Sequence, residues 1–425
     1  MTDIAAVVRL LVVLLLIAMT VILLTRRLEL PYTLGLVTVG LIISLVGHPP
    51  EFHLTPELVL FVFLPALLFE GAWSISLNHL LKNWRVILLL AVPGLLLEVV
   101  LIAVPLHLLT VLPWSDAFLL AAILSPTDPV AVLGLFRQLK IDVRLSTIIE
   151  GESLFNDGVA GVLYKVCLVF VLLPLNGQEF SLGEILWQSA ETLVLEAGGG
   201  ILLGLACGFL VSRFVRFIDD GLLETTLTIV TAYGLYLLAD FLHTSGILAV
   251  IIGGLVLGSY GRERGMSERT REAVDNFWSM VAFLANALLF LLVGAQLDPS
   301  EFLTPGRAGS LLWIAGLVIV LVLLARFVIV LLLPRHISPF DGLRLRSWRF
   351  VIFWSGLRGA LSMALVLALP VSMPDREELI FSTYAVVLFT LLVQGFSLRW
   401  ILKRLPFSLR SEKPVPETNV VDQER

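Results

Sequence analysis

The chain has few charged residues and almost no cysteine. Charged residues make up 15% of its 425 residues and hydrophobic ones 58%, which excludes a soluble globular protein and indicates several membrane spans. Cys167 and Cys207 both lie in apolar segments, so the sequence has no disulfide framework, no C-x-x-C motif and no metal-binding cysteine spacing. No basic segment precedes residues 4–24 and no A-x-A cleavage site follows them, so we expect a retained first helix rather than a signal peptide.

Long apolar segments bounded by polar residues, proline or glycine dominate the rest of the chain. A membrane core of about 30 Å requires about 20 helical residues. The sequence therefore predicts an all-α polytopic membrane protein with about 13 transmembrane helices, followed by a short polar tail that we expect to be disordered. The predicted spans are 4–24, 32–46, 57–73, 84–109, 114–139, 145–174, 187–217, 222–242, 246–260, 274–297, 308–333, 348–369 and 379–400.

The basic residues alternate between the two sides of these spans. Of the 29 Lys and Arg residues, 23 lie in or at the edge of a connection after an odd-numbered span or in the C-terminal segment, 2 lie in connections after even-numbered spans, and four are assigned to the spans themselves. Excess Lys and Arg marks the cytoplasmic side of a membrane. The sequence therefore predicts an odd number of spans, with the N-terminus outside and the C-terminus inside.

Two spans are interrupted by helix-breaking residues and a charge. The fifth contains Ser-Pro-Thr-Asp-Pro at 125–129, and the twelfth contains Gly-Leu-Arg-Gly at 356–359. A broken helix survives in hydrocarbon only where it is buried or lines a polar cavity, and such a pair in two inverted repeats indicates a transport site. At a crossing of the two segments, we expect Asp128 to neutralise the positive helix ends and Arg358 the negative ones.

A second carboxylate lies deep in the neighbouring span. Asp157 is 13 residues beyond Arg144, or about 20 Å at 1.5 Å per residue, which places it near the bilayer centre. An ionisable residue at that depth indicates function by default. Ser153 lies one turn before Asp157 on the same helix face. Oxygens of Asp157, Ser153 and the broken backbone at Thr127 would suit a small hard cation such as sodium.

The buried charges allow several pairings. Glu152 lies at a depth that matches both Arg326 and Arg358, so depth alone does not select its partner. Lys165 either reaches the membrane surface or forms an ion pair, and a structural salt bridge with Asp157 is one alternative to an ion-binding role. Glu70 either lies near the site or faces water at the inner end of its span. Three further acids lie in no motif, and we expect them to pack or to line cavities: Glu98, Glu196 and Asp240.

These motifs together resemble a known family, the NhaP-type sodium/proton antiporters of the first cation–proton antiporter family, which includes the animal sodium/proton exchangers. The resemblance covers nearly all of residues 1–400. It rests on the motifs Thr127-Asp128-Pro129, Glu152-Ser153, Asn156-Asp157, Ala325-Arg326-Phe327 and Gly356-Leu357-Arg358-Gly359, and on the segments 30–33, 63–70, 245–250 and 286–294.

The resemblance assigns roles to these residues. It implies that Asp157, in an Asn-Asp pair with Asn156, binds the ion and the proton. It also implies that Thr127 and Ser153 supply ligand oxygens for sodium. The remaining implied roles are Asp128 at the helix crossover, Glu70 near the site, Glu152 in a structural ion pair with Arg326, and Arg358 stabilising the second broken helix.

The resemblance also implies a domain organisation and a homodimer. The chain would comprise scaffold helices (1–83), core transport helices (84–174), a linker helix with further scaffold helices (175–307), more core transport helices (308–402) and a short cytoplasmic tail (403–425).

The implied function is exchange of sodium or lithium for protons across the cell membrane. One ionisable group at the site implies electroneutral, one-for-one exchange. We expect no enzymatic activity, no cofactor and no nucleic-acid partner; sodium, protons, membrane lipid and a second copy are the expected partners. The alternatives are potassium/proton antiport, a sodium-coupled organic-acid symporter, a channel, and an intramembrane aspartic protease, whose Gly-x-Gly-Asp signature the sequence lacks.

Overall fold

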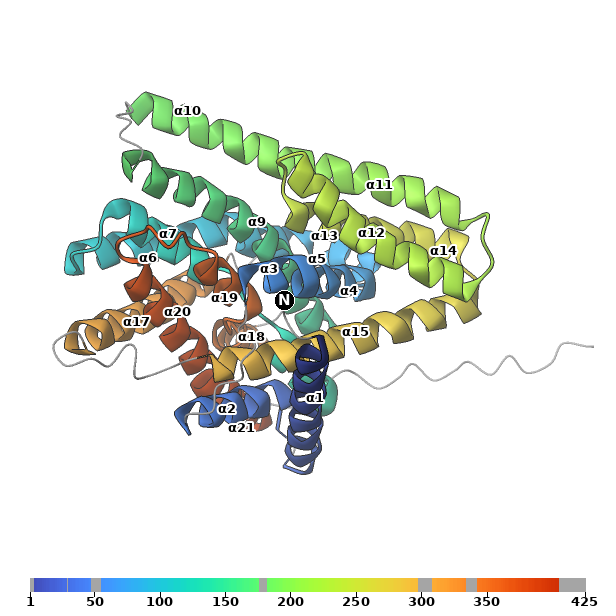
Figure 1. Ribbon diagram of the computed structural model, residues 1–425, viewed down its shortest axis with the longest axis horizontal. Helices are drawn as coiled ribbons and strands as arrows, with labels where there is room; N and C mark the ends of the chain where they lie inside the picture. The colour runs from blue at the N-terminus through green and yellow to red at the C-terminus, as the bar shows by residue number, and fades with distance from the viewer. Residues whose placement is uncertain are drawn as a thin grey trace, which may run out of the picture.

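The computed structural model describes residues 4–28, 30–46, 55–175, 182–296, 308–333 and 342–404, which form helices joined by short connections (Figure 1). The α-helices of the first half are α1 (Ile4–Arg27), α2 (Tyr32–Leu45), α3 (Pro56–Leu58), α4 (Leu64–Ser74), α5 (Leu77–Leu89), α6 (Leu95–Leu109), α7 (Trp114–Leu124), α8 (Val130–Leu139), α9 (Val143–Leu175) and α10 (Leu182–Leu193). Those of the second half are α11 (Gly199–Val215), α12 (Gly221–Phe241), α13 (Gly246–Val256), α14 (Arg262–Gly265), α15 (Glu268–Ala295), α17 (Ala308–Leu332), α18 (Gly342–Trp354), α19 (Ala360–Leu367), α20 (Arg376–Phe389) and α21 (Phe396–Arg404). Five π-helical turns continue α-helices without a break: η1 (Val59–Phe63), η2 (Leu90–Gly94), η3 (Val194–Gly198), η4 (Leu257–Gly261) and η5 (Thr390–Gly395).

The predicted all-α polytopic fold is confirmed. Among the described residues, ten helices are long and apolar enough to cross a membrane. The shorter helix α2 and the two interrupted pairs, α7–α8 and α18–α19, correspond to the three remaining predicted spans. Both interruptions lie where proline and glycine predicted them, at residues 125–129 and 355–359.

Several helices begin earlier than the predicted spans, and the fourth span differs most. The fourth span was expected at 84–109, but the helix begins at Leu77 and continues through the π-helical turn η2 to Leu109. Lys82 and Arg85, which the prediction counted with the connection before this span, therefore both lie on the helix, where they are exposed. The first turns of α5 are amphipathic, and a search for continuous apolar residues does not detect such a segment.

The end of the chain differs slightly from the prediction. The tail was expected at 403–425, but α21 extends to Arg404, with Lys403 and Arg404 in its last turn. Basic residues in the last turn are favourable because they face the negative end of the helix dipole. The rest of the predicted tail lies outside the described residues.

The interrupted helices lie inside the bundle. Helix α7 packs against α6 and α9, and α19 packs against α20 and α7. Figure 1 shows α10 and α11 along one edge of the molecule, α1 at the opposite edge, and α9 between them. The broken backbone is therefore enclosed by protein, which is where hydrocarbon allows it.

Helices α2 and α15 approach each other closely through glycine. A Cβ atom at Gly40 would lie 2.3 Å from the Leu291 carbonyl oxygen, and one at Gly294 would lie 2.3 Å from the Val37 carbonyl oxygen. Small residues allow membrane helices to pack backbone against backbone. This contact holds α2 against the helix that carries Asn286 to the cavity described below.

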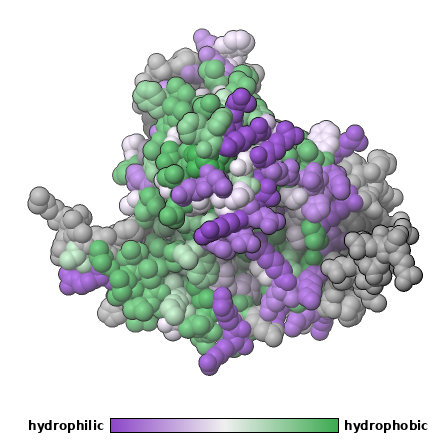
Figure 2. Space-filling view, turned by 90° about the vertical axis from the view of Figure 1, so that its right-hand side faces the viewer, coloured by the Kyte–Doolittle hydropathy of each residue, from purple (hydrophilic) through white to green (hydrophobic). Residues whose placement is uncertain are grey.

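Charged residues gather at one end of the bundle. Figure 2 shows hydrophilic residues across the middle of the face at the α14 end, next to a hydrophobic area. Arg262 forms an ion pair with Asp275 at 2.6 Å, and Arg216 donates a hydrogen bond to the Tyr260 hydroxyl at 2.8 Å. The positive-inside rule predicts that this end faces the cytoplasm.

Candidate ion-binding site

The two interruptions meet in the centre of the bundle. The backbone N–H of Asp128 donates a hydrogen bond to the Leu357 carbonyl oxygen at 2.7 Å. The N–H of Arg358 donates to the Thr390 hydroxyl at 3.1 Å, which holds the second interruption against η5. Each broken segment thus supplies partners for backbone groups that the helices leave unpaired. This crossing is the arrangement that the inverted repeat predicted.

Asp128 lies at the two helix N-termini that face the crossing. Its carboxylate accepts hydrogen bonds from the N–H of Val130, at 3.0 Å, and from the N–H of Ala360. These residues are the first of α8 and α19, so one negative charge faces two positive helix ends. A Cβ at Gly359 would lie 2.1 Å from Asp128 Oδ2, so the close approach requires glycine at that position.

Arg358 lies at the opposite helix end. Its side chain is 0% exposed, and Nη1 donates to the carbonyl oxygens of Ser125 at 2.7 Å and Pro126 at 3.2 Å. These carbonyls follow the C-terminus of α7, where the helix dipole is negative. Nη2 pairs with the buried carboxylate of Glu98 on α6. The sequence had suggested only a packing or cavity-lining role for Glu98, because its partner is remote in the chain.

Thr127 is held by two side chains of α9. Ser153 Oγ donates to the Thr127 carbonyl oxygen, and Asn156 Nδ2 donates to Thr127 Oγ1 at 2.8 Å. Ser153 and Asn156 are three residues apart and therefore share a helix face. The structure thus brings Thr127, Ser153 and Asp157, the three residues predicted to supply sodium ligands, to one cavity. Ser153 and Thr127 are hydrogen-bonded to each other.

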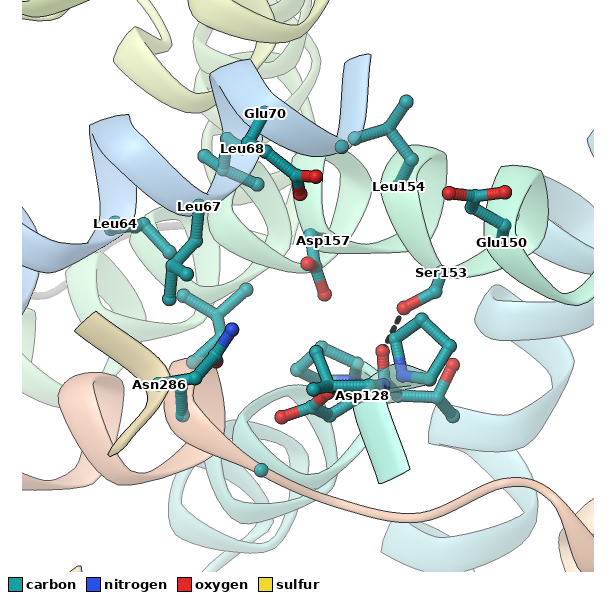
Figure 3. A pocket seen from close by; sticks show the side chains of 18 of the residues that line it. Leu64, Leu67, Leu68, Glu70, Asp128, Glu150, Ser153, Leu154, Asp157 and Asn286 are labelled. Carbon is teal, nitrogen blue, oxygen red and sulfur yellow. Dashed lines mark hydrogen bonds between the residues drawn. The ribbon is translucent and has the colours of Figure 1, made fainter. Parts of the chain in front are cut away.

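Asp157 faces a cavity beside the crossing. In the part of the chain that the structure describes, its carboxylate has no hydrogen bond and no ion pair. The charged group that interacts with it electrostatically is Asp128. Figure 3 shows the Asp157 side chain pointing into this space between α4 and the crossing. A carboxylate without a protein partner is available to a proton or a cation.

The cavity has a volume of about 120 Å³ and contains acidic residues from three elements. Glu70 of α4 lines the cavity, and the resemblance implied that it lies near the site. Ser74 Oγ, on the same helix, donates a hydrogen bond to Glu70 Oε1 at 3.0 Å. Three polar residues of the lining were not among the site candidates from the sequence: Glu150, Asn286 and Ser362. Glu150 is two helical turns before Asp157, so the helical period alone could have placed it on the same face.

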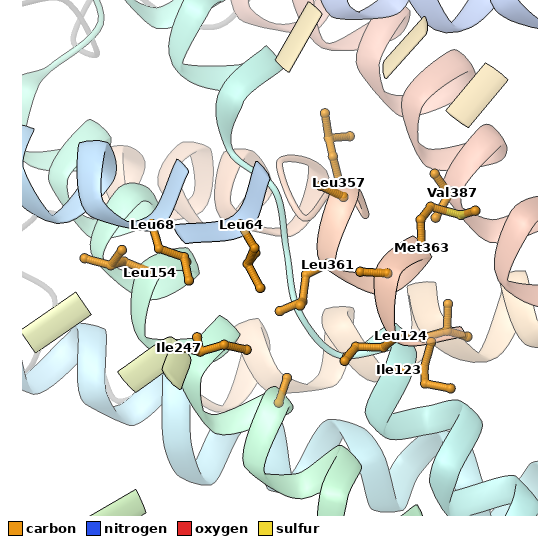
Figure 4. Packing of buried hydrophobic residues seen from close by; sticks show 14 of the residues in the cluster. Leu64, Leu68, Ile123, Leu124, Leu154, Ile247, Leu357, Leu361, Met363 and Val387 are labelled. Atoms are coloured by element: carbon orange, nitrogen blue, oxygen red, sulfur yellow. The ribbon is translucent and has the colours of Figure 1, made fainter. Parts of the chain in front are cut away.

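Apolar residues enclose the rest of the site. Figure 4 shows Leu64 and Leu68 of α4, Leu154 of α9 and Leu361 of α19 in the buried apolar cluster, together with Ile247 of α13. Leu64, Leu68, Leu154 and Leu361 also line the cavity. Such walls lower the local dielectric, which strengthens every charge interaction inside.

Glu152 points away from the cavity and pairs with Arg326 of α17. Arg326 Nη1 binds Glu152 Oε1, Nη2 lies 3.0 Å from Oε2, and Nη2 also donates to the Ile352 carbonyl oxygen at 3.3 Å. Both side chains are buried. Of the two partners that depth allowed, the structure therefore has Arg326, while Arg358 takes Glu98.

Lys165 pairs with Glu196 rather than with Asp157. Its Nζ lies 2.8 Å from both carboxylate oxygens of Glu196, in the turn η3. Lys165 is half exposed and Glu196 is mostly buried. The third acid without a motif, Asp240, is exposed.

The oxygen atoms at the site are of mixed kinds. Across the described ranges, no three His, Cys, Asp or Glu side chains form a group that could hold a metal ion. The predicted sodium ligands are instead one carboxylate, one hydroxyl and one backbone carbonyl, which is a set that hard cations accept.

Comparison with known proteins identifies the family. A family model described as "Sodium/hydrogen exchanger, transmembrane" matches residues 12–404. The Na(+)/H(+) antiporter ApNhaP of Aphanothece halophytica is 39% identical over 382 residues, which cover 89% of this chain and 70% of that protein. The Na(+)/H(+) antiporter NhaH of Halobacillus aidingensis is 36% identical over 401 residues, covering 92% of this chain and 96% of that protein.

A solved structure has the same fold. The sodium proton antiporter MjNhaP1 from Methanocaldococcus jannaschii matches with a TM-score of 0.74 and 19% sequence identity, covering 95% of this chain and 99% of that one. The family match, which includes both interruptions and Asp157, places the chain in the sodium/hydrogen exchanger family of transmembrane proteins.

Proposed function

We propose that this protein exchanges sodium for protons across the cell membrane, one for one, with Asp157 binding either ion. The observation that carries the proposal is that Asp157 faces the cavity without a protein partner in the described structure, whereas Asp128, Glu98, Glu152 and Glu196 each have one. The names of relatives such as ApNhaP, a Na(+)/H(+) antiporter, support the same activity.

The mechanism follows from the cost of a charge in this environment. A bare carboxylate at the membrane centre is unfavourable, and one proton or one sodium ion relieves the charge equally. If the protein changes state only with Asp157 loaded, the two ions compete for it and exchange is obligatory. Because one carboxylate carries the load, one proton replaces one sodium ion and no net charge moves.

The position of the cavity supports alternating access. Its lining comes from α4 and α15, which belong to the segments that the resemblance assigns to the scaffold, and from α9 and the two interruptions, which belong to the core. Movement of the core against the scaffold would therefore open the cavity to one side at a time. Ser153 and the Thr127 carbonyl would travel with Asp157 as sodium ligands.

The test uses the full chain reconstituted in vesicles with a pH gradient, and follows proton movement after sodium is added. We expect wild type and Asp240→Asn, which removes an exposed acid that does not line the cavity, to move protons, and Asp157→Asn to move none. Retained exchange in Asp157→Asn would remove Asp157 from the mechanism. The same assay with lithium and potassium separates sodium or lithium from potassium exchange, and an organic solute requirement would indicate a symporter.

Two further measurements test the stoichiometry and the competition. Clamping the membrane voltage with a potassium ionophore should leave the wild-type rate unchanged, and a clear acceleration would contradict one-for-one exchange. Lowering the pH should raise the KM for sodium and leave the rate at saturating sodium intact, because protons and sodium occupy the same carboxylate. A fall in the saturated rate at constant KM would contradict competition.

We also propose that the protein functions as a homodimer without a cofactor, which rests on the resemblance to NhaP-type antiporters. Light scattering on the detergent-solubilised protein measures the protein mass of the particle. A mass of one chain at all concentrations would contradict the dimer.

A further inference from the structure

Ser362 is a buried hydroxyl that the protein leaves without a partner. It lies in the first turn of α19, three residues after Gly359, and its side chain is 0% exposed. Among the described residues, no hydrogen-bond partner is found for Ser362 Oγ. Burial of a hydroxyl without a partner costs free energy, and such a group requires an explanation.

The cavity explains where the missing partner lies. Ser362, on α19, lines the same cavity as Asp157 on α9. Besides the Asp157 carboxylate, the oxygens predicted to bind the ion are Ser153 Oγ and the Thr127 carbonyl oxygen, and these two are hydrogen-bonded to each other. Ser362 is therefore a residue of the cavity lining whose hydroxyl oxygen is neutral, buried and without a hydrogen-bond partner in the described structure.

We propose that Ser362 Oγ is a ligand of the sodium ion that Asp157 binds. This inference rests on the proposed function and adds to it the contribution of the second broken helix. Asp157 and Ser153 come from α9 and Thr127 comes from the first interruption, whereas Ser362 comes from α19, directly after the second interruption. A cation between them ties the two interrupted segments together, so that occupancy of the site is communicated to both repeats.

A bound water is the competing explanation, because a cavity of about 120 Å³ has room for it. The two explanations differ in what sodium does. If Ser362 binds sodium, replacing it weakens sodium binding; if it binds only water, sodium affinity is unaffected.

The experiment measures the sodium Kd by calorimetry on the full chain in detergent, with choline chloride as the counter-salt, together with the rise in Tm that sodium produces. We expect Ser362→Ala to raise the sodium Kd about tenfold. A polar contact to a charged group changes an affinity by about this factor. Without sodium, the Tm of Ser362→Ala should equal or exceed the wild-type value, because the variant removes an unsatisfied group. Ser362→Thr retains the hydroxyl and should restore most of the affinity.

Ser382 provides a matched control. It is also a 0% exposed serine with no partner for its hydroxyl in the described structure, but it lies on α20 and does not line the cavity. We expect Ser382→Ala to leave the sodium Kd unchanged. If Ser362→Ala does not fold, Ser362→Cys replaces the hard oxygen with a soft sulfur of similar size and should weaken sodium binding likewise.

The inference is wrong if Ser362→Ala binds sodium within twofold of the wild type, or if Ser382→Ala weakens binding equally. Asp157→Asn distinguishes the two proposals. If Asp157→Asn loses sodium binding but Ser362→Ala keeps the wild-type Kd, only the role of Ser362 is overturned. Full binding in Asp157→Asn overturns the proposed function itself.

Discussion

Glu98 and Arg358 form a buried ion pair although 260 residues separate them in the chain. The pair joins α6 to the second interruption, and Arg358 also binds the carbonyls that end α7. One arginine therefore connects both repeats at the crossing. The pair stands beside the cavity without lining it, which indicates a role in holding the broken backbone rather than in carrying ions.

Removal of one partner from this pair should destabilise the protein. Glu98→Gln leaves the Arg358 charge buried without a counter-charge, and we expect the free energy of unfolding to fall by about 3–5 kcal/mol. Denaturation in detergent measures this change. In a double-mutant cycle, Glu98→Gln combined with Arg358→Gln should cost less than the sum of the single changes. Additive losses would show that the two charges do not interact.

The Glu152–Arg326 pair allows a direct contrast with Asp157. Glu152→Ala strands a buried arginine and should lower the free energy of unfolding by about 3–5 kcal/mol. Asp157→Asn removes a carboxylate that has no protein partner, so its Tm should not fall. Thermal unfolding of the two variants side by side is the measurement. Equal stability of Glu152→Ala and wild type would refute the structural role of this pair.

Gly359→Ala should abolish transport. The added Cβ would lie 2.1 Å from Asp128 Oδ2, so either the Asp128 carboxylate or the backbone of the interruption must shift. The control is Gly316→Ala on α17, where a Cβ meets no atom within 4 Å and where alanine is favoured over glycine by about 0.5–1 kcal/mol. Vesicle exchange assays on both variants test this. Wild-type exchange in Gly359→Ala would show that the crossing tolerates displacement.

Lys165→Gln should retain sodium–proton exchange, because Lys165 pairs with Glu196 and not with Asp157. Its half-exposed position limits the stability loss to about 1 kcal/mol or less. Proton movement in vesicles and the Tm are the two readouts. Loss of exchange in a stably folded Lys165→Gln protein would contradict this and would favour the alternative that Lys165 interacts with Asp157.

Much of the candidate site was predictable because its signals are local. Helix-breaking residues cluster around a charge at 125–129 and at 356–359, so the two interruptions could be located from the residues alone. Asp157 and Ser153 share a helix face by their spacing, and the structure brings them to Thr127. The early start of the helix at Leu77 was missed because an amphipathic first turn lacks a continuous apolar signal.

The sequence by itself determined that the chain crosses the membrane many times, where two of its helices break, and which face of each helix carries a charge. Hydrophobic length and helical period contain that information, since both are properties of neighbouring residues. The tertiary structure alone decided that Glu98 pairs with Arg358, that Lys165 pairs with Glu196, and that Ser362 joins Asp157 at one cavity. The helical period indicates on which face of a helix a side chain lies, but not which residue of another helix it contacts. Those contacts depend on how helices that are distant in the chain pack together.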